Sequence, residues 1–158
     1  MPSRRAAIVM TEPELHRFLG EERLVTVASI GPNGRPHLMP LYYVADGAVI
    51  STWTFAKSQK VKNLERLPQA TLQVEAGEHY HELRGAMLEC DVEIIRDTDQ
   101  VAALGVELFA RQSGVAPADL GDDVRGMVGQ QAPKRVALHF VERERATWDH
   151  RKLAAGVY

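Results

Sequence analysis

The chain has few cysteines, few aromatic side chains and no long apolar segment. Its single cysteine, Cys90, cannot form an intramolecular disulfide, which favours a reducing compartment, and we expect the protein in the cytoplasm. No apolar stretch approaches the roughly 20 residues that a membrane-spanning helix needs, so we expect no membrane partner. The formal net charge of -2 argues against nucleic acid as a partner, because proteins that bind it usually carry a basic excess.

The chain also lacks internal repeats, low-complexity tracts and linkers. Its 158 residues, 45% hydrophobic and 25% charged, are enough for one domain with one core. We therefore predict a single domain over residues 1–158. Residues 1–10, MPSRRAAIVM, carry two arginines and an apolar run that is too short for a secretory segment. We predict that they form a loose N-terminal arm.

Local patterns predict a mainly β protein with flanking helices. The segment TEPELHRFL opens with a capping box, in which Thr11 caps the helix and Glu14 lies three residues later. Helices are expected over 12–20, 58–68, 97–112 and 118–129. Strands rich in β-branched and apolar residues are expected over 23–30, 35–44, 48–53, 70–76 and 80–97, followed by two strands within 134–150.

Short turns join most of these strands. The segment GPNG, residues 31–34, favours a tight turn, so a hairpin is expected there. Pro40 lacks an amide donor, which indicates an edge or a bulge in the second strand. Gly85 is expected at a bulge or bend of the long fifth strand. Together these features predict an antiparallel β-barrel with helices outside it.

Hydroxyl and lysine side chains gather in STWTFAKSQKVKNL, residues 51–64, where a predicted strand ends and a helix begins. Free backbone amides and the helix dipole favour an anion at such a helix start. Ser51, Thr52 and Ser58 add hydroxyl donors, and Lys57 and Lys60, three residues apart, could face the same way. The segment predicts a phosphate site, whereas the competing interpretation is that the lysines form the solvated face of a short surface helix.

Other chemistry-bearing residues do not combine into a metal or nucleophile site. His79 and His81 share one face of a predicted strand, but a metal site needs a third or fourth ligand with them, so no metal is expected. Cys90 alternates with apolar neighbours, which indicates a buried structural thiol. The serines lack a local activation signature, so no Ser-His-Asp nucleophile is expected.

The order of hairpin, strand, KSQKVKNLERLP helix and next strand resembles the split-barrel flavin-binding superfamily of the pyridoxamine 5'-phosphate oxidases. The resemblance covers about residues 24–153. The segment KVKNL and the ending TWDHRKL are similar to one branch, the actinobacterial deazaflavin-dependent oxidoreductases, which bind coenzyme F420 instead of FMN. The resemblance implies an antiparallel split β-barrel and a homodimer, with each cofactor site in a cleft between two subunits.

The resemblance also implies which residues hold the cofactor. Its phosphate-side motif matches Ser51, Thr52, Ser58, Lys60 and Asn63, with Lys57 as an adjacent candidate. The family's oxidases carry Ser-Arg-Lys where this chain has Ser58-Gln59-Lys60, so one phosphate-binding arginine is absent.

The second strand departs from the oxidases as well. It reads HLMPLYYV and lacks the arginine and lysine that hold FMN in the oxidases. An apolar strand containing Pro40 suits the deazaflavin branch, in which this strand lines the ring. His37, on the same strand, is a candidate for contact with the cofactor or an exposed strand-start residue. Oxidation of pyridoxamine phosphate is not expected, because no C-terminal substrate-phosphate residues match.

The tail WDHRK is implied to lie near the dimer interface and the cofactor. Trp148 is a candidate for packing on the ring, and His150, Arg151 and Lys152 are candidates for the coenzyme's acidic tail. The competing interpretation makes Trp148 an interface anchor and the charged residues a polar rim.

The implied activity is hydride transfer between F420 and a small unsaturated organic substrate. The chemistry belongs to the cofactor, so no catalytic residue is assigned. One alternative is an FMN-dependent oxidoreductase of the same fold. Another is a carrier or sensor that binds a flavin, deazaflavin or haem without turnover, and a third is a structural dimer with a vestigial pocket.

Overall fold

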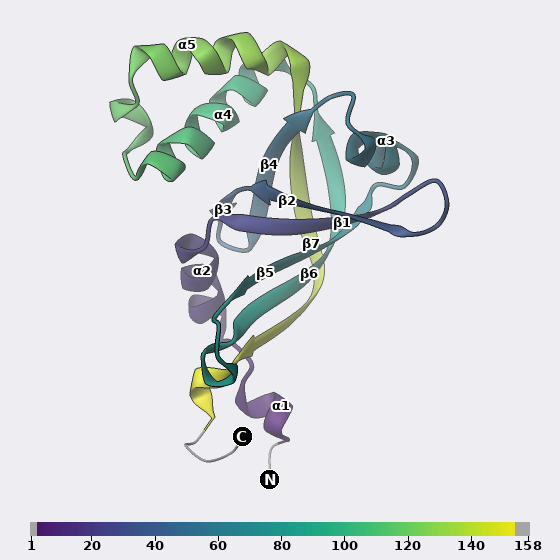
Figure 1. Ribbon diagram of the computed structural model, residues 1–158, viewed down its shortest axis with the longest axis vertical. Helices are drawn as coiled ribbons and strands as arrows, with labels where there is room; N and C mark the ends of the chain where they lie inside the picture. The colour runs from purple at the N-terminus through teal and green to yellow at the C-terminus, as the bar shows by residue number, and fades with distance from the viewer. Residues whose placement is uncertain (1–2, 154–158) are drawn as a thin grey trace.

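The fold is a single curled antiparallel sheet with helices around it (Figure 1), as a computed structural model describes it for residues 3–153. The seven strands lie in the order β2-β1-β5-β6-β7-β4-β3. Strand β2 also contacts β4, which curls the sheet into the predicted split barrel. The strands are β1 (Leu24–Ile30), β2 (Pro36–Tyr42), β3 (Val44–Asp46), β4 (Val49–Phe55), β5 (Gln69–Ala76), β6 (Arg84–Ile95) and β7 (Arg135–Asp149).

Helices lie around the sheet rather than in one layer of their own (Figure 1). They are α1 (Arg4–Ala7), α2 (Glu12–Glu21), α3 (Gln59–Arg66), α4 (Thr98–Ser113) and α5 (Asp122–Gln131), with short 3-10 turns at Tyr80–Glu82, Pro117–Asp119, Ala132–Lys134 and His150–Lys152. The capping box predicted for α2 is present, because Thr11 Oγ1 accepts from the Glu14 amide and Glu14 accepts from the Thr11 amide. None of the helices in the described part of the chain is long and apolar enough to cross a bilayer.

The core is built by strand alternation and by α2. Side chains of β1 point alternately inward and outward, as a half-buried strand requires. Leu15, Phe18 and Leu19 of α2 are almost completely buried against the inner face of the sheet. At the C-terminal end of α2, Arg111 of α4 donates to three backbone carbonyls. These bonds join α2 to α4.

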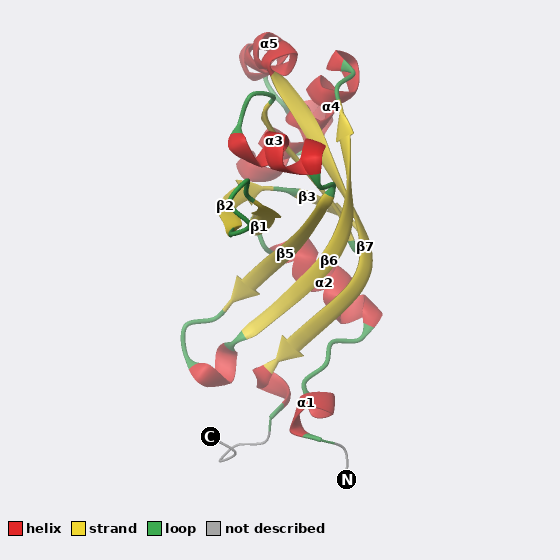
Figure 2. Ribbon diagram, turned by 90° about the vertical axis from the view of Figure 1, so that its right-hand side faces the viewer, coloured by secondary structure: helices red, strands yellow, loops and turns green. Residues whose placement is uncertain are grey.

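Strand β7 is one continuous strand, so the prediction of two final strands is wrong. It runs for 15 residues and pairs with β6 and β4. The register between β6 and β7 shifts after Glu89. Glu89 pairs with Glu144 and Cys90 pairs with Glu142, so Arg143 is the extra residue of a bulge. The bulge lets β7 bend and twist without ending, and Figure 2 shows the curved course of β6 and β7.

Gly85 is not the site of a bulge or bend, which corrects the second expectation for this strand. It pairs in regular register with Trp148 of β7. A Cβ placed on Gly85 would lie only 2.1 Å from Cζ2 of Trp148. Glycine is therefore required here by the close approach of the indole ring.

The N-terminal segment is more ordered than the predicted loose arm. Residues 1–2 lie outside the described residues, but Arg4–Ala7 form α1. The Met10 amide donates to Thr147 Oγ1 over 2.9 Å, and the Asp149 amide donates to the Ile8 carbonyl over 2.8 Å. These long-range bonds to the end of β7, together with burial of Met10, fix the segment, and neither contact could be read from the local sequence.

The carboxylate at the end of β7 gives an expected pH dependence. Asp149 is buried and accepts from the backbone amide and the guanidinium of Arg151, which lowers the pKa of Asp149 from its usual 3.8. A carboxylate with a lowered pKa stabilises the fold above its unfolded-state pKa, and this contribution is lost as the pH falls through the folded-state pKa. Asp149→Asn should lower the melting temperature at pH 7, and the difference from the wild type should shrink below about pH 3.8.

The matched control is Asp46→Asn, because Asp46 is exposed and forms no ion pair within residues 3–153. Thermal unfolding of both variants across the pH range measures the effect. A difference for Asp149→Asn that stays constant from pH 7 to pH 2 would contradict the assignment.

Candidate functional site

Strand alternation separates the two hydroxyls predicted to act together in β4. Thr52 points into the barrel and is 0% exposed, and its Oγ1 has no hydrogen-bond partner within residues 3–153. Ser51 points to the opposite face, where its Oγ lies 3.0 Å from Nδ1 of His139. Ser51 and His139 line a cavity of about 440 Å³ beside α4. Only Thr52 therefore shares the inner face with the lysine of α3.

Lys60 is buried, which rules out the solvated-face interpretation for this lysine. It is 7% exposed, and its Nζ donates to Thr54 Oγ1 over 3.0 Å. Thr54 follows Thr52 on the inner face of β4. Thr54 was not among the site residues predicted from the sequence, although its position two residues after Thr52 indicated the same strand face. Lys57 and Lys62, by contrast, are exposed.

The start of α3 leaves hydrogen-bond donors unused. Ser58 is the N-cap residue, but its side chain makes no capping bond. Its Oγ is buried and has no partner in the described part of the chain. The first amides of any helix have no acceptor within the helix. Together they form a set of donors that suits an anion.

Two cations near this helix start lack a counter-charge. Burial lowers the pKa of Lys60, and the positive charge of Arg135 lowers it further. Burial also lowers the pKa of Arg135, whose Nε is buried without a hydrogen-bond partner. Neither residue forms an ion pair with any residue from 3 to 153. We call Thr54, Ser58 and Lys60, with the first amides of α3, the anion cradle.

Asn63 connects the helix of the anion cradle to β1. It is 0% exposed, accepts from Gln59 Nε2 over 2.9 Å and donates to Ser29 Oγ of β1 over 3.1 Å. This chain of bonds fixes α3 on the barrel. Contact of Asn63 with a cofactor stays a prediction, as it does for Ser51, Thr52, Lys57, Ser58 and Lys60.

The two predicted residues of β2 lie on opposite faces. His37 is opposite Ser29, is partly buried, and has an Nδ1 without a partner in the described chain. It lines a cavity of about 430 Å³ between the hairpin and Gln59, so it lies beside the start of α3. Pro40 is opposite Thr26 and is exposed on the outer face. Its strand is an edge strand, as expected.

The tail lies at the other end of the molecule from the anion cradle (Figure 1). Trp148 follows Arg135 by thirteen residues of the same strand, which is about 40 Å along it at roughly 3.3 Å per residue. Lys152 Nζ donates to Glu14 Oε2 over 2.6 Å, and His150 Nδ1 lies 2.8 Å from the Tyr80 carbonyl. A single subunit therefore does not bring the two halves of the predicted site together.

The histidine pair lies in a turn, and the cysteine is buried. Residues Tyr80–Glu82 form a 3-10 turn rather than the predicted strand, because the strand starts only at Arg84. The rings of His79 and His81 stack with centroids 5.9 Å apart. No group of three or more metal-ligating side chains exists among residues 3–153. Cys90 is buried, and burial raises the pKa of its thiol to about 12.

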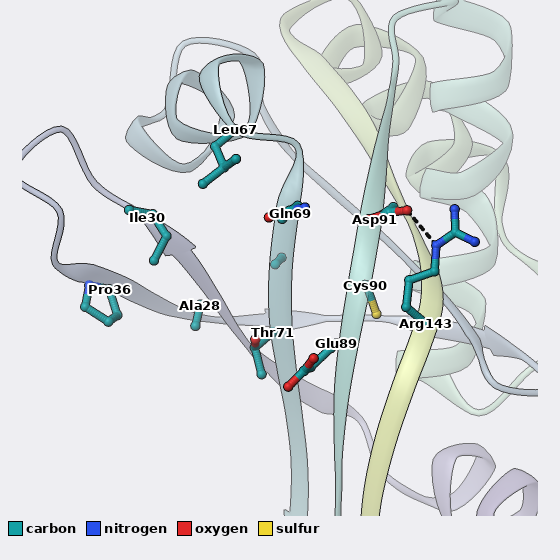
Figure 3. Close-up of a pocket in the computed structure, with 11 residues that line it drawn as sticks. Ala28, Ile30, Pro36, Leu67, Gln69, Thr71, Glu89, Cys90, Asp91 and Arg143 are labelled. Carbon is teal, nitrogen blue, oxygen red and sulfur yellow. Dashed lines mark hydrogen bonds and ion pairs between the residues drawn. The ribbon is translucent and has the colours of Figure 1, made fainter.

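The outer face of the sheet carries a groove of about 500 Å³ (Figure 3). Its walls come from β1, β2, β5, β6 and β7, and an ion pair between Asp91 and Arg143 lies at one side. Several large apolar side chains remain exposed beside it on the same face, namely Leu24, Leu38 and Tyr42. Exposed apolar groups that gather on one sheet face indicate an interaction surface.

The curled antiparallel sheet, with a helix directly after β4, is the architecture of a split β-barrel. The family described as Pyridoxamine 5'-phosphate oxidase matches residues 11–149. The chain belongs to this family, as the motif order had implied. No curated protein matches the chain significantly.

Several solved structures are also similar to this chain. The conserved hypothetical protein Rv2991 from Mycobacterium tuberculosis is 36% identical, with a TM-score of 0.85 and 98% of each chain covered. An F420 reductase is 20% identical, with a TM-score of 0.63 over 82% of this chain and 94% of its own. HutZ, a haem storage protein from Vibrio cholerae, is 14% identical, with a TM-score of 0.63 over 84% and 90%. At such low identity the last two are similar in fold alone.

Proposed function

We propose that this protein is an oxidoreductase that transfers a hydride between coenzyme F420 and a small unsaturated organic substrate. The observation that carries the proposal is the anion cradle, in which buried Lys60 faces no carboxylate within residues 3–153. Burying a charge without a counter-charge is costly. An anionic ligand removes that cost, and the phosphate of a flavin-type cofactor has the required charge.

The donor set fits a phosphate group. The Lys60 ammonium supplies a point charge, Ser58 and Thr54 supply hydroxyls, and the first amides of α3 supply backbone donors. The unpartnered Nδ1 of His37 lies on the hairpin beside the same helix start. Lys60 would hold the phosphate, whereas the apolar β2 would lie towards the ring.

The composition of β2 favours the deazaflavin over FMN. The strand Pro36–Tyr42 has no arginine or lysine, so it offers no cation to a flavin ring or to a second phosphate contact. The similarity of the fold to an F420 reductase supports the same choice. The bound cofactor would supply the hydride chemistry, and the protein would orient it and exclude water.

We also propose a homodimer in which the tail of a second copy completes the site. Within one chain the anion cradle and Trp148 lie at opposite ends of β7. The exposed apolar side chains of Leu24, Leu38 and Tyr42 offer a surface for the second copy. Of the tail cations, Lys152 and Arg151 already pair with Glu14 and Asp149, so an acidic coenzyme tail would compete with these carboxylates.

The dimer surface can be tested by introducing a charge into it. Leu38 lies on β2 and is 58% exposed in the single chain. A glutamate at this position should disfavour the dimer, because burying an unpaired carboxylate in an interface is costly. Leu38→Glu is expected to be a monomer by light scattering. Val115→Glu, at a 42% exposed position outside the sheet, should keep the wild-type mass. Equal masses for both variants and the wild type would reject this surface.

The cofactor assignment can be tested by fluorescence titration of the purified protein with F420, FMN and haem in separate experiments. Tight F420 binding with weak FMN binding is the expected result, followed by oxidation of reduced F420 when an unsaturated acceptor is added. Preference for FMN would move the protein to the flavin oxidases. Tight haem binding, or cofactor binding without turnover of any acceptor, would favour a carrier, for which the fold similarity to HutZ is the supporting observation. Binding of none would reject the proposal.

A further inference from the structure

Helix α4 borders a cavity on the face of β4 that points away from the anion cradle. The cavity has a volume of about 440 Å³ and lies between α4 and strands β3, β4 and β7. Ser51 lines it, whereas Thr52 and Thr54 point to the inner face of the sheet, because successive residues of a strand alternate between its two faces. The cavity is therefore separate from the site proposed for the cofactor phosphate.

The helix that borders this cavity is held at two points. Gly105 packs so closely on Trp53 of β4 that an added Cβ would lie 2.6 Å from Cζ3 of the indole. Further along α4, Arg111 donates to three backbone carbonyls at the end of α2. Leu104 and Ala137, which line the cavity, belong to a small core beneath the helix. These contacts fix α4, so the cavity is formed before any ligand enters, as is usual for small-molecule sites.

A hydrogen-bonded pair of side chains from two strands lines the cavity. Ser51 of β4 and His139 of β7 are directly opposite in the sheet, and Ser51 Oγ lies 3.0 Å from Nδ1 of His139. Nε2 of His139 makes no hydrogen bond within residues 3–153. When Nδ1 carries the proton and donates to Ser51, Nε2 is an acceptor. The pair can then accept an N–H group of a ligand.

The ionic side chains that line the cavity are acidic. They are Asp46 of β3 and Glu107 of α4, and no lysine or arginine of the described chain lines it. Both carboxylates are exposed, and neither forms an ion pair with any residue from 3 to 153. Glu93 of β6 lies opposite His139 on the other side and has no ion pair within the same residues. Negative charge that lacks a counter-charge favours a cation in this cavity.

The lining suits an organic cation better than a metal ion. No group of three or more side chains that could hold a metal exists among residues 3–153. Apolar side chains complete the walls, among them Val44, Val49, Leu104 and Leu138. Such walls favour an apolar body, and the acceptors favour one protonated nitrogen on it. The volume lies within the range of about 300–1,000 Å³ that small-molecule sites occupy.

We propose that this cavity is a binding site for a small organic amine. The protonated nitrogen donates to Nε2 of His139 in the field of Asp46 and Glu107, and the apolar body packs between α4 and β7. The site uses the outer face of β4, whereas the anion cradle uses the inner face. It therefore does not depend on which cofactor the protein binds.

Three probes that share one carbon skeleton separate charge from shape, namely 2-phenylethylamine, 2-phenylethanol and phenylacetate. Calorimetric titration of the purified full-length protein should show the amine binding about 10-fold more tightly than the alcohol, with phenylacetate the weakest. Glu107→Gln should reduce the advantage of the amine over the alcohol by about 3- to 10-fold and leave binding of the alcohol unchanged. Asp99→Asn is the matched control, because Asp99 is an exposed carboxylate of the same helix that does not line the cavity.

A second variant tests the location of the site. Ala103 is exposed on α4 and lines the cavity, so Ala103→Trp should fill the cavity without disturbing the core. Binding of the amine and of the alcohol should both be lost, and melting temperatures show whether each variant is folded.

Four outcomes would overturn the proposal. They are binding of none of the probes, equal binding of all three, amine binding that survives in folded Ala103→Trp, and equal effects of Glu107→Gln and Asp99→Asn. The last would show only a general attraction to the negative net charge. Titration of the wild-type protein with F420 tests the proposed function separately, so either proposal can fail while the other stands.

Discussion

Replacing Lys60 by methionine is expected to weaken cofactor binding by about 1.5–3 kcal/mol, roughly 10- to 150-fold. The reason is loss of a charge-assisted bond to phosphate from a lysine that is 7% exposed and has no carboxylate partner in the described chain. The stability of the cofactor-free protein should change by less than about 1 kcal/mol. Removal of an uncompensated buried charge offsets loss of the bond to Thr54.

The pH dependence gives an independent measurement of the same residue. Burial and the charge of Arg135 lower the pKa of Lys60 below 10.5. Phosphate binding needs the protonated ammonium, so affinity should fall as the pH rises through this lowered pKa. Lys60→Met should bind weakly at every pH and lose that step. Titrations by fluorescence between pH 7 and pH 10 measure both effects.

Lys62 provides the matched control, because it lies on the same helix but is exposed. Lys62→Met removes an equal charge and should reduce affinity only slightly, since exposed charges are screened. If the two variants lose affinity equally, the effect is general electrostatics and the anion cradle is not a specific site. If Lys60→Met unfolds the protein, the lysine is structural.

Substituting Gly85 by alanine should destabilise the protein by about 2–3 kcal/mol, a large effect for one added methyl group. The new Cβ would lie 2.1 Å from Cζ2 and 2.5 Å from Cε2 of Trp148. Both residues sit in regular register on long central strands, so the backbone cannot yield easily and the indole ring must leave its place. Chemical denaturation at constant pH measures the change.

The double variant Gly85→Ala with Trp148→Ala separates this clash from a general intolerance of the strand. Removing the indole ring should make the alanine at 85 nearly neutral, so the two changes are strongly non-additive. Gly126→Ala, in α5 where nothing lies within 4 Å of the added Cβ, should stabilise by about 0.5–1 kcal/mol. Additive effects of the Gly85 and Trp148 substitutions would show that the ring does not determine the glycine.

Local patterns were sufficient for most of the elements and for the fold class. The capping box at Thr11, the turn GPNG and the helix after Ser58 depend on neighbouring residues, and the structure confirms them. The order of strands and helices was enough to identify the split barrel and the family. These features are local or depend on element order, so a single sequence contains them.

Register and long-range pairing decided the rest. Strand alternation sent Ser51 and Thr52 to opposite faces, and a bulge kept β7 continuous where two strands were expected. Lys60 is buried, whereas Lys57 and Lys62 of the same segment are exposed.

The sequence by itself determined the mainly antiparallel fold, the family and the position of a strand-to-helix junction rich in lysines and hydroxyls. Only the tertiary structure paired Ser51 with His139 of β7, 88 positions later in the chain, and carried Trp148 to the far end of the same strand. The physical reason is that helix caps and turns are fixed by bonds between near neighbours. Strand pairing, by contrast, joins distant segments in a register set by burial of one face of the sheet.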